Sequence, residues 1–203
     1  MAGCGCEVEI KNNEQKQILY TLLAINGTMF VVELVAGIIG QSAGLIADSF
    51  DMLADSLVYI ISLYAIGKAY AKKEQAARIS GYFQITLGTL LLLEISRRVI
   101  MGYEPQSALM IIISFIALFA NIACLIIINK HKEGEIHMRA SWIFSKNDVI
   151  ANTGVIIAGF LVYLSGSFWP DLIIGVLIVA IVIRGGLTIL KEAREHCAPG
   201  CSR

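Results

Sequence analysis

Apolar residues fall into six long runs along the chain, separated by shorter polar or glycine-containing links. Each run is close to the length of about twenty residues that an α-helix needs to cross the hydrocarbon core of a bilayer. Backbone polar groups must be satisfied internally in lipid, which favours helices. The sequence therefore predicts six transmembrane helices, over Gln17–Gly40, Ser42–Ile66, Gly81–Ile100, Ala108–Asn129, Trp142–Leu164 and Asp171–Leu190.

The composition supports an all-α membrane protein. Of the 203 residues, 57% are hydrophobic and 16% are charged, and the mean hydropathy is +0.72. A soluble domain is about a quarter charged. The net charge of zero argues against a nucleic-acid partner. The first sixteen residues hold five charges and no apolar run, so no signal peptide is expected.

Basic residues indicate how the chain is oriented. All sixteen Lys and Arg lie in the termini, in the polar links 68–80 and 130–141, or at helix ends beside them, except Arg97 and Arg98. The positive-inside rule then places both termini and both polar links in the cytoplasm. We expect a cytoplasmic tail over 1–16, a six-helix domain over 17–191 and a second cytoplasmic tail over 192–203. The expected location is the cell (inner) membrane, crossed several times.

Three carboxylates interrupt the second predicted helix. Asp48, Asp51 and Asp55 fall within about 60° of one another around a helix, on one stripe. Each acid at mid-membrane costs about 3 kcal/mol, so a compensating role is expected. Asp51 and Asp55 are i,i+4 neighbours whose carboxylates can meet on one hard divalent cation. The alternative is burial or solvation by neighbours, as in a soluble bundle, which is a poorer explanation for three acids in so apolar a chain.

The fifth predicted helix carries a second polar stripe at matching depth. Ser141, Ser145, Asp148 and Asn152 share one of its faces, and Asp148 lies about two turns inside the membrane. Asn147 points about 100° away from Asp148, so adjacency alone does not make it a co-ligand. Ser and Asn residues also serve as packing contacts between membrane helices, which is the alternative for this stripe. We retain Ser145, Asn147 and Asn152 as further ligand or pathway candidates.

Other polar residues inside the spans extend the candidate pathway. Asn26 and Glu33 are seven residues apart in the first helix and nearly eclipsed. Glu33 needs a partner, a proton or water at mid-span, and Asn121 in the fourth helix is one candidate partner. We add Asn26, Glu33 and Asp48 to the pathway candidates. Glu94 and Arg98 are expected to pair structurally as i,i+4 neighbours.

Four cysteines lie in the two expected cytoplasmic tails. Cys4 and Cys6 are near the N-terminus, and Cys197 and Cys201 are near the C-terminus. Disulfides are disfavoured in the cytoplasm, where thiolates bind soft metals such as Zn²⁺ or Cd²⁺. The two tails could thus form one metal site, and the alternative is four independent reduced thiols. Cys124, inside the fourth helix, is expected to serve packing.

Several segments together resemble the cation diffusion facilitator family, whose members are proton-coupled exporters of divalent metals with six transmembrane helices. The segments, in chain order, are GQSAGLIAD, DMLAD, Asn121, MRASWIFSKNDVIANTGVIIAG and WPDL. The resemblance covers nearly the whole chain. It implies that Asp51 and Asp55 form one half of a metal site and that Asp148 belongs to the other half.

The sequence departs from the family pattern in two places. Members carry His or Asp four residues before the acid of the second half-site, and Phe144 stands there in this chain. The implied set of four ligands is therefore one short. Most members also carry a soluble C-terminal domain that binds metal and dimerises, whereas this sequence ends at Arg203. The resemblance thus implies a short form, with any homodimer formed through the membrane helices.

The expected function is efflux of a divalent metal out of the cytoplasm in exchange for protons. Clustered carboxylates suit Zn, Fe, Mn or Cd as the transported ion, and no resident cofactor is expected. One alternative is a non-transporting metal sensor or partner subunit, in view of Phe144. Another is a membrane-embedded metalloenzyme, which is disfavoured because the sequence lacks a His-Glu-x-x-His motif. We expect no enzyme activity.

Overall fold

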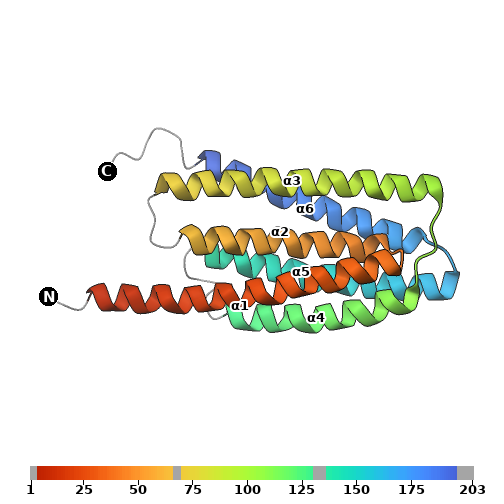
Figure 1. The fold of residues 1–203 in the computed structure, drawn as a ribbon, viewed down its shortest axis with the longest axis horizontal. Coiled ribbons are helices and arrows are strands. Elements are labelled where there is room, and N and C mark those ends of the chain that lie inside the picture. The colour runs from red at the N-terminus through yellow and green to blue at the C-terminus, as the bar shows by residue number, and fades with distance from the viewer. Residues whose placement is uncertain (1–3, 66–69, 130–135, 196–203) are drawn as a thin grey trace.

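The computed structural model describes residues 4–65, 70–129 and 136–195, and within these ranges the chain forms helices and no strands. All six predicted helices are present, which confirms the all-α fold class (Figure 1). Their bounds are α1 Cys4–Ile39, α2 Ala43–Ala65, α3 Tyr70–Met101, α4 Ser107–Asn129, α5 Ile136–Ser165 and α6 Trp169–Glu195.

Four helices are longer than the apolar runs that predicted them. α1 includes most of the segment predicted as a tail, and α3 begins at Tyr70 rather than at Gly81. α5 begins earlier than predicted, at Ile136, and α6 ends later than predicted, at Glu195. The added residues include Ala, Glu, Gln, Lys and Arg, which are strong helix formers. Hydropathy marks the part of a helix that suits lipid, so it understates helices that continue into water.

Five of the helices in the described part of the chain are long and apolar enough to cross a membrane, and α2 is the exception. α2 carries Asp48, Asp51 and Asp55 along its length. It also packs against each of the other five helices, so its polar residues are covered by protein. The helix that carries three acids within its apolar run is thus the one that packs against all the others.

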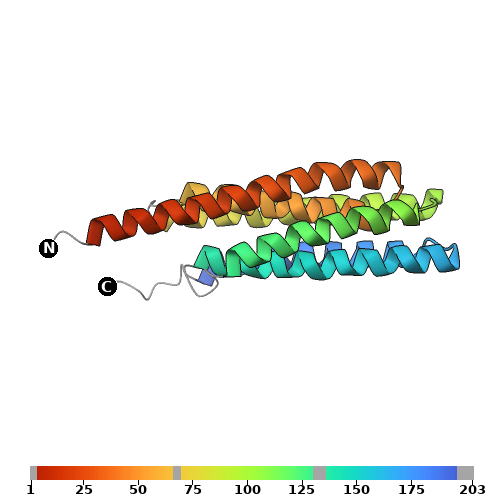
Figure 2. The ribbon, with the colours of Figure 1, turned by 90° about the horizontal axis from the view of Figure 1, so that it is seen from below.

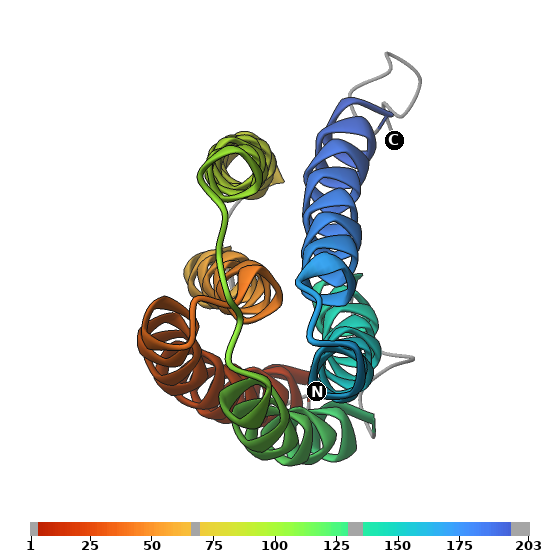
Figure 3. The ribbon, with the colours of Figure 1, turned by 90° about the vertical axis from the view of Figure 1, so that its right-hand side faces the viewer.

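The helices form two layers, with α1, α2 and α3 in one and α4, α5 and α6 in the other (Figure 2). The most extensive contacts join α1 to α2, α4 to α5 and α3 to α6. Seen from one end, α3 and α6 lie on the opposite side of α2 and α5 from α1 and α4 (Figure 3). The first turn of α1 and the last turn of α6 lie at the same end of the bundle (Figure 1).

The polarity of the bundle is the reverse of that of a soluble protein. Its outer surface carries large apolar side chains such as Leu93, Ile100 and Phe119, which are 63%, 84% and 69% exposed. Its interior carries acids, amides and hydroxyls, among them Glu33 and Asp148. An apolar surface of this extent is typical of a face that contacts lipid. The polar interior requires a separate explanation.

Two apolar clusters border this polar interior along the bundle. One surrounds the turn between α1 and α2 and includes Leu45 and Met110. The other lies toward the end where α1 begins and consists of the fully buried Leu19, Leu22, Tyr59, Cys124 and Ile128. The expected packing role of Cys124 is thereby confirmed. Between these clusters, α2 presents its acids.

Glycines bring α3 and α6 into close contact. A Cβ atom added at Gly81 would lie 2.9 Å from the carbonyl oxygen of Gly186, and one added at Gly186 would lie 2.8 Å from that of Gly81. At Gly88 an added Cβ would lie 2.5 Å from Ile183. Small residues at such positions let helix backbones approach closely in membranes. The pair α3–α6 is thus packed backbone against backbone.

The beginning of α2 is capped from the distant helix α6. Both carboxylate oxygens of Asp171 accept hydrogen bonds, from the Ser42 hydroxyl at 2.6 Å and from the backbone N–H groups of Ala43 at 2.6 Å and Gly44 at 2.9 Å. The Ser42 Oγ in turn accepts a bond from the Leu45 N–H at 3.0 Å. Free N–H groups and the positive end of the helix dipole favour an anion here. Asp171 therefore joins α6 to α2.

An ion-pair group lies near the same end of the bundle, on α3. Arg98 contacts Glu94 at 3.0 Å, which confirms the predicted i,i+4 pair. Arg97 makes a second contact with Glu94 at 2.8 Å. Arg98 also donates a hydrogen bond to the carbonyl oxygen of Gln41 at 2.7 Å. The group thus fixes the end of α3 to the turn between α1 and α2.

Candidate cation-binding site

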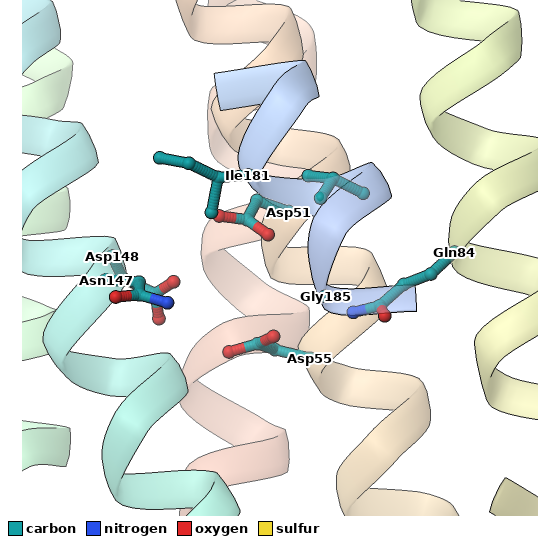
Figure 4. A pocket seen from close by; sticks show the side chains of 8 residues that line it. Asp51, Asp55, Gln84, Asn147, Asp148, Ile181 and Gly185 are labelled. Carbon is teal, nitrogen blue, oxygen red and sulfur yellow. The ribbon is translucent and has the colours of Figure 1, made fainter. Parts of the chain in front are cut away.

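One small pocket in the middle of the bundle is lined by the three acids that the sequence singles out. Asp51 and Asp55 come from α2, and Asp148 comes from α5 (Figure 4). The i,i+4 spacing turns the two α2 carboxylates to the same side, toward α5. The pocket encloses about 20 Å³, which is room for about one water-sized particle. Its further lining residues are Gln84, Asn147, Ile181, Val182 and Gly185.

The pocket acids are almost entirely shielded from solvent. Asp51 is 6% exposed, and Asp55 and Asp148 are each 1% exposed. Asp55 accepts a long hydrogen bond of 3.5 Å from the Tyr59 hydroxyl. Oδ2 of Asp148 is fully buried and has no hydrogen-bond partner in the described part of the chain. Charged groups that lack water and partners are costly, so an arrangement of this kind suits a ligand that supplies positive charge.

The three acids share a pocket, but they do not form a closed coordination shell. Among the described residues, no group of three His, Cys, Asp or Glu side chains lies close enough together to hold a metal ion. Structural metal sites are closed by their protein ligands, whereas sites that exchange their ligand keep open positions. Binding of a cation here would require the side chains of α2 and α5 to move toward it.

Asn147 lies in this pocket beside Asp148, although it is on a different face of α5. The helical projection separates these neighbours by about 100°. The pocket, however, is walled by four helices, α2, α3, α5 and α6, so it adjoins more than one stripe of α5. An amide can present either its oxygen or its N–H groups. Asn147 can therefore coordinate a cation through its oxygen or donate a hydrogen bond to a carboxylate.

Ser145 and Asn152 are fully buried but do not line the pocket. The Asn152 amide donates a hydrogen bond of 3.0 Å to the backbone carbonyl oxygen of Asp148, one turn earlier. Ser145 lies near the Tyr59 hydroxyl. Asn152 thus bonds to the helix turn that carries Asp148, whereas the Ser145 hydroxyl has no hydrogen-bond partner in the described part of the chain.

A second group of buried acids lies on α1 and α2, toward the turn that joins them. Glu33 and Asp48 are fully buried, and none of their four carboxylate oxygens has a hydrogen-bond partner among the described residues. The two side chains are close enough to interact electrostatically with each other and with Asp51. The acids thus continue from the pocket toward one end of the bundle.

Two buried amide residues make contacts between helices, and the pathway role of Asn26 stays a prediction. Asn26 donates to the Leu22 carbonyl oxygen at 3.0 Å and to the Cys124 sulfur at 3.8 Å. Asn121 donates to the Met52 sulfur at 4.0 Å. The suggested bond from Asn121 to Glu33 is not formed, because both Glu33 oxygens lack a partner within the described ranges. The two amides instead join α1 to α4 and α4 to α2.

Sequence reasoning missed the contribution of α3 and α6 to the pocket. Neither Gln84 nor Gly185 is among the residues singled out from the sequence. A polar residue at mid-span was the available signal for Gln84. The role of Asp171 as a cap for α2 was also missed, because its partners lie far away in the sequence.

Some predicted residues lie outside the part of the molecule that is described. The side chains of Cys4, Cys6, Ser141 and Phe144 belong to this group. So do Cys197 and Cys201 as whole residues. The tail thiol site and the effect of Phe144 therefore stay predictions.

The lipid-suited surface and the five apolar helices define an integral, multi-pass membrane protein with a polar centre. Its acids, drawn from neighbouring helices around one pocket, are typical of membrane proteins that handle cations. The chain matches the family described as the cation efflux transmembrane domain over residues 19–196, and it belongs to that family.

Two curated relatives align with most of the chain. It is 25% identical over 195 residues to the cadmium, cobalt and zinc/H(+)-K(+) antiporter of Bacillus velezensis, covering 89% of this chain. It is 23% identical over 193 residues to the protein of the same name from Bacillus subtilis, covering 88% of this chain. The alignments span 62% of the length of each relative.

Proposed function

We propose that this protein exports a divalent metal cation from the cytoplasm in exchange for protons. The observation that carries the proposal is the pocket itself, where Asp51, Asp55 and Asp148 meet at the centre of a lipid-suited bundle. Family membership supports the class of activity. Both aligned relatives are named as antiporters of cadmium, cobalt and zinc against protons and potassium.

In this proposal all six helices cross the membrane, α2 included. α2 has 23 residues, enough to span a bilayer core, and its acids face other helices rather than lipid. Both termini and the two basic links then lie in the cytoplasm, as the positive-inside rule requires. The end of the bundle where α1 begins is the cytoplasmic end, and the turn between α1 and α2 faces the outside.

The chemistry of exchange follows from the carboxylates. Acids that are crowded together without a cation must bind protons or repel one another. A divalent cation that enters from the cytoplasm would displace those protons, and protons arriving from outside would in turn release the cation. Glu33 and Asp48 extend the acids toward the outer end, so they would carry the pathway beyond the pocket.

The apolar clusters on either side of the pocket suit alternating access. Tyr59 and its neighbours seal the inner side, and the residues around Leu45 seal the outer side. A transporter must keep at least one side closed at all times, so that ions do not leak. Opening one cluster while the other stays packed would expose the acids to one side of the membrane only.

The direct test is uptake of metal by the purified protein in liposomes. Vesicles holding a metal-sensitive dye are given Zn²⁺, Mn²⁺ or Cd²⁺ outside, with an acidic interior. We expect metal uptake together with metal-dependent alkalinisation of the interior, and uptake should slow when a protonophore has dissipated the pH gradient before metal is added. Specific metal binding without any uptake would instead favour a sensor or partner subunit.

A further inference from the structure

One polar side chain of α3 reaches the pocket with an unpartnered amide oxygen. Gln84 is 2% exposed, and its Oε1 atom has no hydrogen-bond partner among the described residues. Leaving a buried amide oxygen unpaired costs about 1–3 kcal/mol. Figure 4 shows the Gln84 side chain extending from α3 to Gly185, on the side of α3 that faces the pocket.

Two neighbouring glycines of α6 lie beside the Gln84 side chain. A Cβ atom added at Gly185 would lie 3.4 Å from the Gln84 Oε1 and 3.7 Å from its Nε2, which is ordinary van der Waals contact, so the amide lies beside α6 at this glycine. An added Cβ at Gly186 would lie 3.1 Å from the Gln84 Cβ. Gly186 thus lets the α6 backbone lie close to α3 beside the base of the Gln84 side chain.

We propose that Gln84 is a specificity-determining contact of the transported cation, contributed by α3 to a site otherwise formed by α2 and α5. This inference rests on the proposed function of the pocket. A glutamine amide carries an oxygen that can coordinate a cation and N–H groups that can donate to a carboxylate. It can therefore serve both states of the site, donating to an acid when the pocket is empty and turning its oxygen inward when a cation is bound.

The donor set determines the class of cation. With Gln84, every polar side chain that lines the pocket is a carboxylate or an amide, from Asp51, Asp55, Asp148, Asn147 and Gln84. Carboxylate and carbonyl oxygens are hard ligands that suit Mn²⁺, whereas thiolate favours soft ions and imidazole suits Zn²⁺. We expect the amide of Gln84 to favour Mn²⁺ over Cd²⁺.

The experiment compares Gln84→Leu with a matched control. Gln15 on α1 is also 2% exposed with an unpartnered Oε1, but it does not line the pocket, so Gln15→Leu makes the same chemical change elsewhere. Mn²⁺ and Cd²⁺ are titrated separately into purified protein. Gln84→Leu should weaken Mn²⁺ binding about tenfold or more and Cd²⁺ binding less, while Gln15→Leu leaves both unchanged.

A second variant keeps the test informative if Gln84→Leu does not fold. Gln84→His replaces the amide with imidazole and should move the preference from Mn²⁺ toward Zn²⁺ in a competition titration. Wild-type affinities in Gln84→Leu, an equal loss in Gln15→Leu or an unchanged preference in Gln84→His would each overturn the inference. Absence of specific metal binding by the wild type would instead count against the proposed function.

Discussion

Asp171 and the pocket acids are all buried carboxylates, but they differ in how their negative charge is compensated. Asp171 on α6 is fully buried, and it accepts three hydrogen bonds at the beginning of α2. The pocket acids are equally buried, yet Asp148 has a carboxylate oxygen with no partner among the described residues. Asp55 has only a long contact with Tyr59. The same residue type at the same burial thus occurs in two different environments.

We propose that the difference separates a structural acid from acids that bind the transported cation. Asp171 replaces lost water with backbone N–H groups and the dipole of α2, so its carboxylate is stabilised by the fold itself. The pocket acids have no comparable compensation within the described bundle. A membrane protein retains such groups at a cost, and a cationic substrate or a proton can offset that cost. Local partners, rather than burial, therefore distinguish the two roles.

The largest effect on transport is expected from removing single charges in the pocket. Asp51→Asn, Asp55→Asn and Asp148→Asn keep the side-chain volume but remove a carboxylate ligand. Each should reduce proteoliposome uptake to background, with the protein still eluting as a folded species in detergent. Uptake near the wild-type rate in all three variants would show that these acids do not form the transport site.

The largest effect on stability is expected at Asp171. Asp171→Ala removes three hydrogen bonds and leaves the beginning of α2 uncapped, so unfolding should become easier by about 2 kcal/mol or more. Ser42→Ala removes one of the three, together with the bond from the Leu45 N–H to the Ser42 hydroxyl, and serves as a graded control. Thermal unfolding in detergent measures both. A fully stable Asp171→Ala protein that has lost metal binding would reverse the assigned roles.

Glu33 and Asp48 should give intermediate effects on transport. Glu33→Gln and Asp48→Asn remove a negative charge that interacts with Asp51 but leave the pocket side chains in place. We expect uptake slowed severalfold, with the affinity of the pocket for metal changed by less than tenfold. Initial uptake rates and equilibrium titrations separate the two quantities. Complete loss of binding in either variant would place these acids within the site itself.

The smallest effect is expected at the ion-pair group of α3. Glu94 is paired with Arg97 and Arg98 near the end of the helix, where its side chain is 33% exposed. Partly exposed ion pairs contribute about 0–1 kcal/mol. Glu94→Gln should therefore lower the unfolding temperature slightly and leave uptake unchanged, in a parallel assay with the pocket variants. A loss of uptake would assign this pair a role in transport.

The sequence was sufficient to predict the helices and to bring the three acids to a common depth. Carboxylates stand out in apolar runs because their cost in lipid is high, so Asp51, Asp55 and Asp148 were readily found. The roles of Gln84 and Asp171 depend on which helix faces α2 and on how that helix is rotated about its axis. Both follow from packing between segments that are distant in the sequence. The glycines of α3 and α6 set that packing, and hydropathy does not register them.

The most direct test of the contrast between Asp171 and the pocket acids is stabilisation of the protein by bound metal. A ligand that binds only the folded state raises the unfolding temperature in proportion to its binding free energy. Unfolding is followed with and without Mn²⁺ or Zn²⁺ in the wild type, Asp148→Asn and Asp171→Asn. We predict that metal stabilises the wild type and Asp171→Asn but not Asp148→Asn. Equal stabilisation of Asp148→Asn, or its loss only in Asp171→Asn, would contradict the account.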